Sequence, residues 1–297
     1  MKVAVIGNCQ ISGIVEALRH SGYVEAEPFS LAELRTAGRT ETEAARLPSF
    51  DWIVIQNIEV IGLLPEYAPY RLSRLQDISP NVIVIPSLAF TGFHPDCTAI
   101  INASSKVIRT PAGDYSSALI VAAFMLGLPA RRTERLFNAY VYQQLRYFDE
   151  ANKAFSSLQE YSRRCGMDLS SSVTAWLNQG VSFMHTINHP VAFALEGLAK
   201  LIAARIGVPP SLIRLERDNL ASNTIWPVYP ELAERLKVQG SLLFKPAGAA
   251  GTISLGEMIE GCYEAYERAS DSIQISPHIA RTKAIIEKSL VSEYVTA

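Results

Sequence analysis

The sequence predicts an α/β protein with a mostly parallel N-terminal sheet, crossover helices and a helix-rich C-terminal half packed on that sheet. Three observations support this class. Before about residue 112, short β-branched runs alternate with helical patterns, which favours parallel strands joined by right-handed crossovers. After that residue, helical patterns dominate. Apolar residues make up 48% of the 297 residues, which is ample for a buried core.

Four short runs in the N-terminal part have the composition of buried strands. They are rich in β-branched residues and end at glycine, proline or polar residues. After the first run, apolar residues at i, i+3, i+4 and i+7 predict a helix from Ile11 to about Gly22. The four runs are residues 2–6, 24–29, 51–56 and 81–85, and a helix around residues 70–78 separates the last two.

The C-terminal half is predicted to be a series of helices. The helix at residues 190–206 has Pro190 in its first turn and Gly207 at its end. We expect residues 1–112 to form an α/β, Rossmann-like part and residues 113–297 a mainly helical part that shares one core with it. The other predicted elements are helices at 114–128, 131–164 (one long helix or two), 229–238, 255–269 and 279–290, and a short strand at 242–244.

Charge and hydropathy exclude several classes of protein. The net charge of −2 is unsuited to coating nucleic acid or an anionic membrane. The longest apolar run, residues 118–130, is shorter than the roughly 20 residues of a transmembrane helix and contains Gly127 and Pro129. The N-terminus has too short an apolar stretch for a signal peptide. We therefore expect a cytoplasmic protein without a nucleic-acid partner or a membrane segment, and a homo-oligomer stays open.

The cysteines and histidines do not form a metal-binding pattern. No C-x-x-C pair occurs among the four cysteines, which we expect to be free thiols in a cytoplasm. His185 and His189 are four residues apart, but the H-E-x-x-H pattern is absent and the segment has loop character. We expect no bound metal.

The loop Gly7-Asn8-Cys9-Gln10, between the first strand and the first helix, is the first candidate site. Gly7 permits a tight turn. The unpaired N–H groups at the start of the helix can hold an oxyanion or a phosphate, and they favour a lowered pKa at Cys9. The dinucleotide fingerprint and the P-loop pattern both fail here. Packing of Cys9 under the sheet is the competing interpretation.

The second candidate is the segment Phe93-His94-Pro95-Asp96, which follows the fourth strand. Ligands of α/β proteins bind at the carboxyl ends of parallel strands, so Cys9 and His94 are predicted to leave the same edge of the sheet. A nucleophile and base could then meet, with Asp96 orienting the imidazole. Alternatively, His94 is a surface loop residue and Asp96 caps a turn.

The third candidate is Asn188-His189-Pro190, which is predicted to lie at the start of a helix. There Asn188 and His189 would form either an oriented polar pair or a structural cap. Basic side chains that could pair with a phosphate are Arg131, Arg132, Arg135 and Lys245, although a solvated helix face explains the arginines as well.

These motifs in this order resemble the WcbI-type polysaccharide (capsule) biosynthesis family of proposed acetyltransferases. The resemblance covers about residues 3–268, and this sequence departs from it at Ser116, where a histidine is expected beside Tyr115. It rests on VIGNCQ (5–10), AFTGFHPD (89–96), SSALIVAAFMLGLP (116–129), INHP (187–190) and YPELAERLKVQGSLLFKPAG (229–248).

The resemblance implies binding of coenzyme A or acetyl-CoA, and acetyl transfer to a hydroxyl of an activated or lipid-linked sugar. It favours Cys9, His94 and His189 as catalytic residues. The residues assigned to oxyanion or substrate contacts are Asn8, Gln10, Asp96, Ser116 and Asn188, and those assigned to coenzyme A are Arg131, Arg132 and Lys245.

Two other functions fit the same residues. The position of Gly7-Asn8-Cys9 resembles the layout of SGNH-type hydrolases, which would make the protein a thiol esterase or thioesterase that uses Cys9. A non-catalytic sugar- or nucleotide-binding accessory protein of polysaccharide assembly is the third hypothesis.

Overall fold

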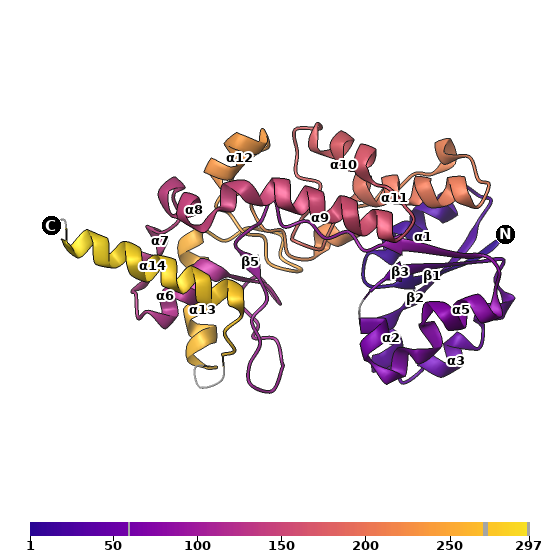
Figure 1. Cartoon of the computed structure of the whole chain (residues 1–297), viewed down its shortest axis with the longest axis horizontal. Coiled ribbons are helices and arrows are strands. Elements are labelled where there is room, and N and C mark those ends of the chain that lie inside the picture. The colour runs from indigo at the N-terminus through magenta and orange to yellow at the C-terminus, as the bar shows by residue number, and fades with distance from the viewer. Residues whose placement is uncertain (59, 270–272, 296–297) are drawn as a thin grey trace. The chain divides into compact units, whose positions relative to one another are not determined.

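A computed structural model of the chain describes residues 1–58, 60–269 and 273–295. The chain forms two compact units that are interleaved in sequence (Figure 1). Unit 1 contains Met1–Ala89, Ser156–Leu177 and Asn188–Leu220, and unit 2 contains the remainder. The sequence predicts a division between residues 112 and 113, which coincides with none of these boundaries. That the two predicted parts share one core stays a prediction.

Unit 1 is built on a parallel sheet of four strands with the order β2-β1-β3-β4. All four strands predicted from the sequence are confirmed. Pro28 is tolerated in β2 because this strand lies at the edge of the sheet, where a missing backbone N–H need not remove a hydrogen bond between strands. The strands are β1 (Lys2–Gly7), β2 (Glu25–Ser30), β3 (Trp52–Asn57) and β4 (Val82–Pro86).

Helices cover both faces of this sheet (Figure 1). One face buries Ile6, Ile53 and Ile55 under α2, η2 and α5. The opposite face carries α1, with α11 packed beside it. The elements of unit 1 are α1 (Ile11–His20), α2 (Leu31–Thr36), α3 (Thr40–Ala44), η1 (Leu47–Ser49), α4 (Val60–Leu63), η2 (Pro65–Tyr70), α5 (Leu72–Ile78), α10 (Ser170–Leu177), α11 (Ala192–Arg205) and η4 (Pro210–Leu212).

The strand order places a topological switch point between β1 and β3. From β1 the chain passes through α1 to β2 on one side, and β3 then pairs with the other side of β1. The loops that follow β1 and β3 therefore diverge to opposite faces of the sheet and leave a crevice at their carboxyl ends. Open α/β sheets bind their ligands in this crevice.

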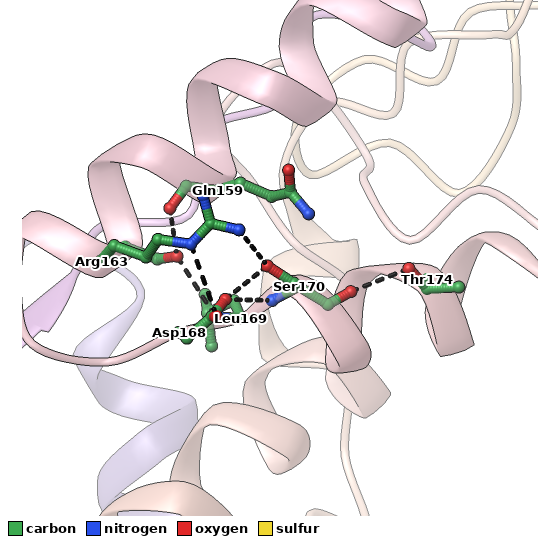
Figure 2. A network of polar contacts seen from close by, with 7 residues as sticks. Gln159, Arg163, Asp168, Leu169, Ser170 and Thr174 are labelled. Atoms are coloured by element: carbon green, nitrogen blue, oxygen red, sulfur yellow. Dashed lines mark hydrogen bonds and ion pairs between the residues drawn. The ribbon is translucent and has the colours of Figure 1, made fainter.

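The connection from α9 (Glu150–Arg164) to α10 is held by exposed polar contacts (Figure 2). Asp168 accepts a hydrogen bond from the Ser170 backbone N–H at 2.8 Å and another from the Ser170 hydroxyl. The Arg163 guanidinium contacts Asp168 at 3.5 Å and the Ser170 hydroxyl at 3.2 Å. The hydrogen bonds from Ser170 lower the pKa of Asp168. This exposed carboxylate thus accepts hydrogen bonds from the first residue of α10.

Unit 2 is centred on the buried helix α6 (Ala118–Met125), which packs against α13 (Leu255–Glu267) and α14 (Pro277–Val295). Its other elements are a two-stranded antiparallel ladder of β5 (Cys97–Thr98) and β6 (Ser116–Ser117), and the helices α7 (Ala130–Glu134), α8 (Ala139–Leu145), η3 (Tyr147–Asp149) and α12 (Pro230–Leu236). The 3₁₀ turn η5 (Asn219–Ser222) and α9 each contain a boundary between the units. No helix in the described part of the chain combines the length and apolar character needed to cross a membrane.

Three predicted elements differ from the structure. The helix predicted at 114–128 begins only at Ala118, because Ser116 and Ser117 pair with β5. The region 131–164 contains α7, α8, η3 and α9 rather than one or two helices, because Asn138 caps a new helix and Arg146 adopts a left-handed φ of 62°. The strand predicted at 242–244 is reduced to isolated bridges at Phe244 and Lys245.

Candidate active site

The loop Asn8-Cys9-Gln10 lies at the switch point of unit 1, between the end of β1 and the start of α1. Gly7 is required there, because a Cβ at this position would lie 2.1 Å from Oε1 of Gln56. That oxygen accepts a hydrogen bond from the Asn8 backbone N–H at 2.8 Å. The end of β3 thereby fixes the course of the loop that leaves β1.

The Gln10 side chain is fully buried and ties three segments of unit 1 together. Its Oε1 accepts hydrogen bonds from Gln56 Nε2 at 3.1 Å and from the Leu88 N–H at 3.0 Å. Its Nε2 donates to the carbonyl oxygens of Leu88 and Asn188, both at 2.8 Å. Both amide hydrogens are therefore already donated. In this arrangement the expected contact of this amide with an oxyanion is not available, and the Gln10 side chain instead holds the loop to its neighbours.

Asn8 completes the same arrangement. Its Nδ2 donates to the Ser87 hydroxyl at 3.0 Å, and its Oδ1 accepts from the Gln10 backbone N–H at 3.0 Å. We call the set of Asn8, Gln10, Gln56, Ser87, Leu88 and Asn188 the strand-end network. It joins the loop after β1, the ends of β3 and β4, and the segment before α11.

Cys9 is the exposed member of this loop, whereas Cys97, Cys165 and Cys262 are buried. The surrounding protein desolvates the sulfur and raises the pKa of Cys9, and the opposing effect of its own backbone N–H is smaller. The predicted lowering of this pKa is therefore wrong. The start of α1 does not supply enough positive potential to outweigh desolvation.

Asn188 and His189 precede α11 in the sequence, but neither is its N-cap residue. The helix has Val191 as N-cap, and the N–H of Ala192 donates to Asp218 at 3.0 Å. His189 is therefore not the predicted capping residue. Asn188 is exposed and His189 half-buried, and the Asn188 carbonyl connects this segment to Gln10.

His94 belongs to unit 2 and is 1% exposed. Burial lowers its pKa to about 3, and the charge of His185 contributes to the shift, while the backbone of Trp226 opposes it. Among the described residues neither ring nitrogen makes a hydrogen bond of normal geometry, although the Trp226 backbone lies close enough to oppose the pKa shift. His94 is thus a buried, neutral imidazole, and the alternative of a surface loop residue is wrong.

Asp96 does not orient His94. Its buried carboxylate accepts hydrogen bonds from the Leu119 backbone N–H at 2.9 Å, from Tyr147 at 2.9 Å and from Tyr229 at 2.7 Å. The Ser117 hydroxyl donates a fourth. The carboxylate stabilises the first turn of α6, whose N-cap is Ser117, and satisfies two buried tyrosines. We call Asp96, Ser117, Tyr147 and Tyr229 the Asp96 cluster.

The remaining predicted site residues also belong to unit 2. Ser116 is fully buried, and its hydroxyl is hydrogen-bonded to Tyr266, so a direct substrate contact is not available. Arg131 and Arg132 are exposed on α7. Lys245 is half-buried, and its Nζ donates to the carbonyl oxygens of Ala221 at 2.8 Å and Asn223 at 3.4 Å.

Gln56 and Ser87 also belong to the strand-end network, although no sequence motif indicated them. Both lie at or just beyond the carboxyl end of a predicted parallel strand, which is the signal that could have identified them. No group of three or more metal-ligating side chains occurs in the part of the chain that the structure describes.

An open parallel sheet with a thiol-bearing loop at its switch point defines an α/β protein of the class that binds ligands at the carboxyl ends of its strands. The family model described as polysaccharide biosynthesis enzyme WcbI matches residues 2–211. The chain belongs to this family of polysaccharide biosynthesis enzymes.

A solved structure of WcbI, described as a novel polysaccharide biosynthesis enzyme, has the same fold. It gives a TM-score of 0.69 at 17% sequence identity, over 97% of this chain and 94% of that one. That structure is described as the native protein without a disulfide bond between coenzyme A and one of its cysteines. No curated protein gives a significant sequence match.

Proposed function

We propose that this protein binds coenzyme A and transfers an acetyl group from acetyl-CoA to a hydroxyl of an activated or lipid-linked sugar in capsule or exopolysaccharide biosynthesis. The observation that carries the proposal is the position of Cys9, an exposed residue, at the switch point of a parallel sheet. The family supplies the context of polysaccharide biosynthesis. The similar structure is described in terms of coenzyme A and one of its cysteines, which supports the cofactor.

In this reaction the sugar hydroxyl oxygen attacks the thioester carbonyl. A C–O bond forms, the C–S bond breaks, and the hydroxyl proton passes through a base to the coenzyme A thiolate. His189 is the better candidate base, because its neighbour Asn188 is tied through Gln10 to the loop that carries Cys9. A well-placed base contributes about 10²–10⁴-fold. His94, with a pKa lowered to about 3, is a weak base at neutral pH.

Cys9 is assigned a contact with the thiol end of coenzyme A rather than a covalent acyl carrier. Its raised pKa leaves little thiolate at neutral pH, which disfavours nucleophilic attack. With both Gln10 amide hydrogens donated elsewhere, the backbone N–H of Cys9 is the remaining candidate donor to the developing oxyanion.

Arg131, Arg132 and Lys245 stay predicted contacts of the coenzyme A phosphates. Arg131 and Arg132 are exposed, and Lys245 already has backbone carbonyl partners that orient its ammonium group. A bound phosphate would be a further acceptor for this group.

Titration calorimetry with coenzyme A and acetyl-CoA tests the proposal. We expect micromolar or tighter binding to the wild-type protein, and a weaker affinity in Lys245→Ala. Lys106→Ala, which removes an exposed lysine of the same unit, is the matched control. Absence of binding to both ligands would overturn the proposal.

The role of Cys9 is tested by comparing Cys9→Ser and Cys9→Ala in acetyl transfer to a sugar acceptor. Activity in both variants is expected, since the thiol does not carry the acetyl group. Loss of activity in both variants, together with hydrolysis of acetyl-CoA at the same rate with and without acceptor, would instead support the thioesterase.

A further inference from the structure

A cavity of about 400 Å³ adjoins the switch point of unit 1. It opens at the carboxyl ends of β3 and β4, on the face of the sheet opposite α1. Its volume falls in the range of small-molecule sites. Ile55, Ile58, Ile61, Tyr70, Leu72 and Val84 form the apolar wall.

The wall offers little for a polar ligand to bind. Tyr70 turns its hydroxyl away to the Thr40 carbonyl at 2.9 Å and leaves an apolar surface. Gln56 also belongs to the lining, but it is fully buried and its amide is already hydrogen-bonded to the Asn8 N–H and to Gln10. Exposed polar residues occur in the lining at Asn57, Arg71 and Ser73. An aliphatic group fits these walls better than a sugar or a nucleobase, whose polar edges would lose their hydrogen bonds to water.

Gln56 connects this cavity to the candidate active site. It lines the cavity, and its Oε1 lies 2.8 Å from the backbone nitrogen of Asn8, the residue before Cys9. Gln56 is thus shared by the cavity lining and the strand-end network that holds the Cys9 loop, which places the cavity at the same edge of the unit 1 sheet as Cys9. The loop after β3 and the loop after β1 are the two that flank the crevice at a switch point.

We propose that this cavity is an acyl-chain pocket, and that the protein accepts acyl groups longer than acetyl from coenzyme A thioesters. The inference rests on the proposed function and deepens it by naming the class of acyl group. Affinity should rise about fourfold for each methylene added to the acyl chain until the cavity is filled.

The test is calorimetry with coenzyme A and its acetyl, butanoyl and hexanoyl thioesters, on the wild-type protein and on Val84→Phe. The larger side chain at this half-buried lining position should abolish the gain from acetyl to hexanoyl and leave the affinity for coenzyme A unchanged. Val82→Phe is the matched control, since Val82 lies on the same strand with similar burial but outside the lining.

Gly62→Leu provides a second variant if Val84→Phe does not fold. Gly62 lines the exposed mouth of the cavity, and a Cβ added there would meet no atom within 4 Å. It should also reduce binding of the hexanoyl thioester selectively.

The outcomes separate the two proposals. Binding of coenzyme A without any gain along the thioester series overturns the acyl-chain pocket and leaves the proposed function standing. An equal loss of coenzyme A itself in Val84→Phe also overturns it, because the cavity would then hold part of the coenzyme. Failure of the wild-type protein to bind coenzyme A or any thioester overturns both.

Discussion

The strand-end network of unit 1 and the Asp96 cluster of unit 2 use similar polar groups to different ends. In the first, the amide of Gln10 joins loops around an exposed thiol. In the second, a buried carboxylate takes up two tyrosine hydroxyls and the first turn of a helix. The role of each polar group therefore depends on the partners that its atoms already have. Asp96 has no capacity left for His94, whereas Cys9 is an exposed residue.

Replacing the Asp96 carboxylate should have the largest effect on stability. In Asp96→Ala, the hydroxyls of Tyr147 and Tyr229 and the Leu119 N–H lose their acceptor while remaining buried. At about 1–3 kcal/mol for each buried unsatisfied group, we expect a loss of at least about 3 kcal/mol in the free energy of unfolding, measured with denaturant. A loss below about 1 kcal/mol with abolished activity would show that Asp96 is catalytic and would break the comparison.

Removing the Gln10 amide should have the next largest effect. Gln10→Ala leaves the Leu88 N–H and carbonyl and the Asn188 carbonyl without their partner. We expect a loss of about 2–3 kcal/mol, because water can reach part of this edge and compensate. The measurement is denaturant unfolding together with coenzyme A binding. Unchanged stability with lost binding would instead indicate that the amide contacts ligand directly.

The buried imidazole of His94 should make stability depend on pH. Its pKa is about 3 in the folded protein and near 6.5 when unfolded, so as pH falls below 6.5 the unfolded state takes up the proton first. The stabilisation is complete above pH 6.5 and is lost progressively toward pH 3. From pH 6.5 to about 5, we expect His94 to account for about 2 kcal/mol.

His94→Gln is the matched variant for this measurement, because glutamine is polar and does not titrate. Its free energy of unfolding should fall less than that of the wild-type protein over the same pH interval. Identical pH profiles for the two proteins would show that His94 is not held neutral by burial, and would return it to the candidates for a solvated base.

The sequence was sufficient to predict the sheet, because four buried strands and the first helix each have a local pattern. It also located Gly7 and the Cys9 loop, since a strand that ends in glycine before a helix is a local feature. The breaks within residues 131–164 depend on a left-handed residue, Arg146, and a single capping side chain, Asn138, neither of which changes the helical periodicity.

The partners of the site residues were beyond sequence analysis, because they lie far along the chain. Asp96 is satisfied by Tyr147 and Tyr229, and Gln10 by Leu88 and Asn188. The pKa of Cys9 likewise depends on how much protein surrounds its sulfur. The start of a helix predicts the direction of one contribution, and desolvation, which only the fold determines, is larger.

Asp168 offers an exposed counterpart of Asp96, and the smallest expected effect. It accepts hydrogen bonds from a serine hydroxyl and a backbone N–H near the start of a helix, as Asp96 does, but its side chain is 56% exposed (Figure 2). In Asp168→Ala water replaces the lost acceptor, so the unfolding midpoint should shift far less than in Asp96→Ala. Because the pKa of Asp168 is lowered, its small contribution is present at neutral pH and is lost on acidification. Equal losses in the two variants at neutral pH would show that the number of hydrogen bonds, and not burial, determines what such a carboxylate contributes.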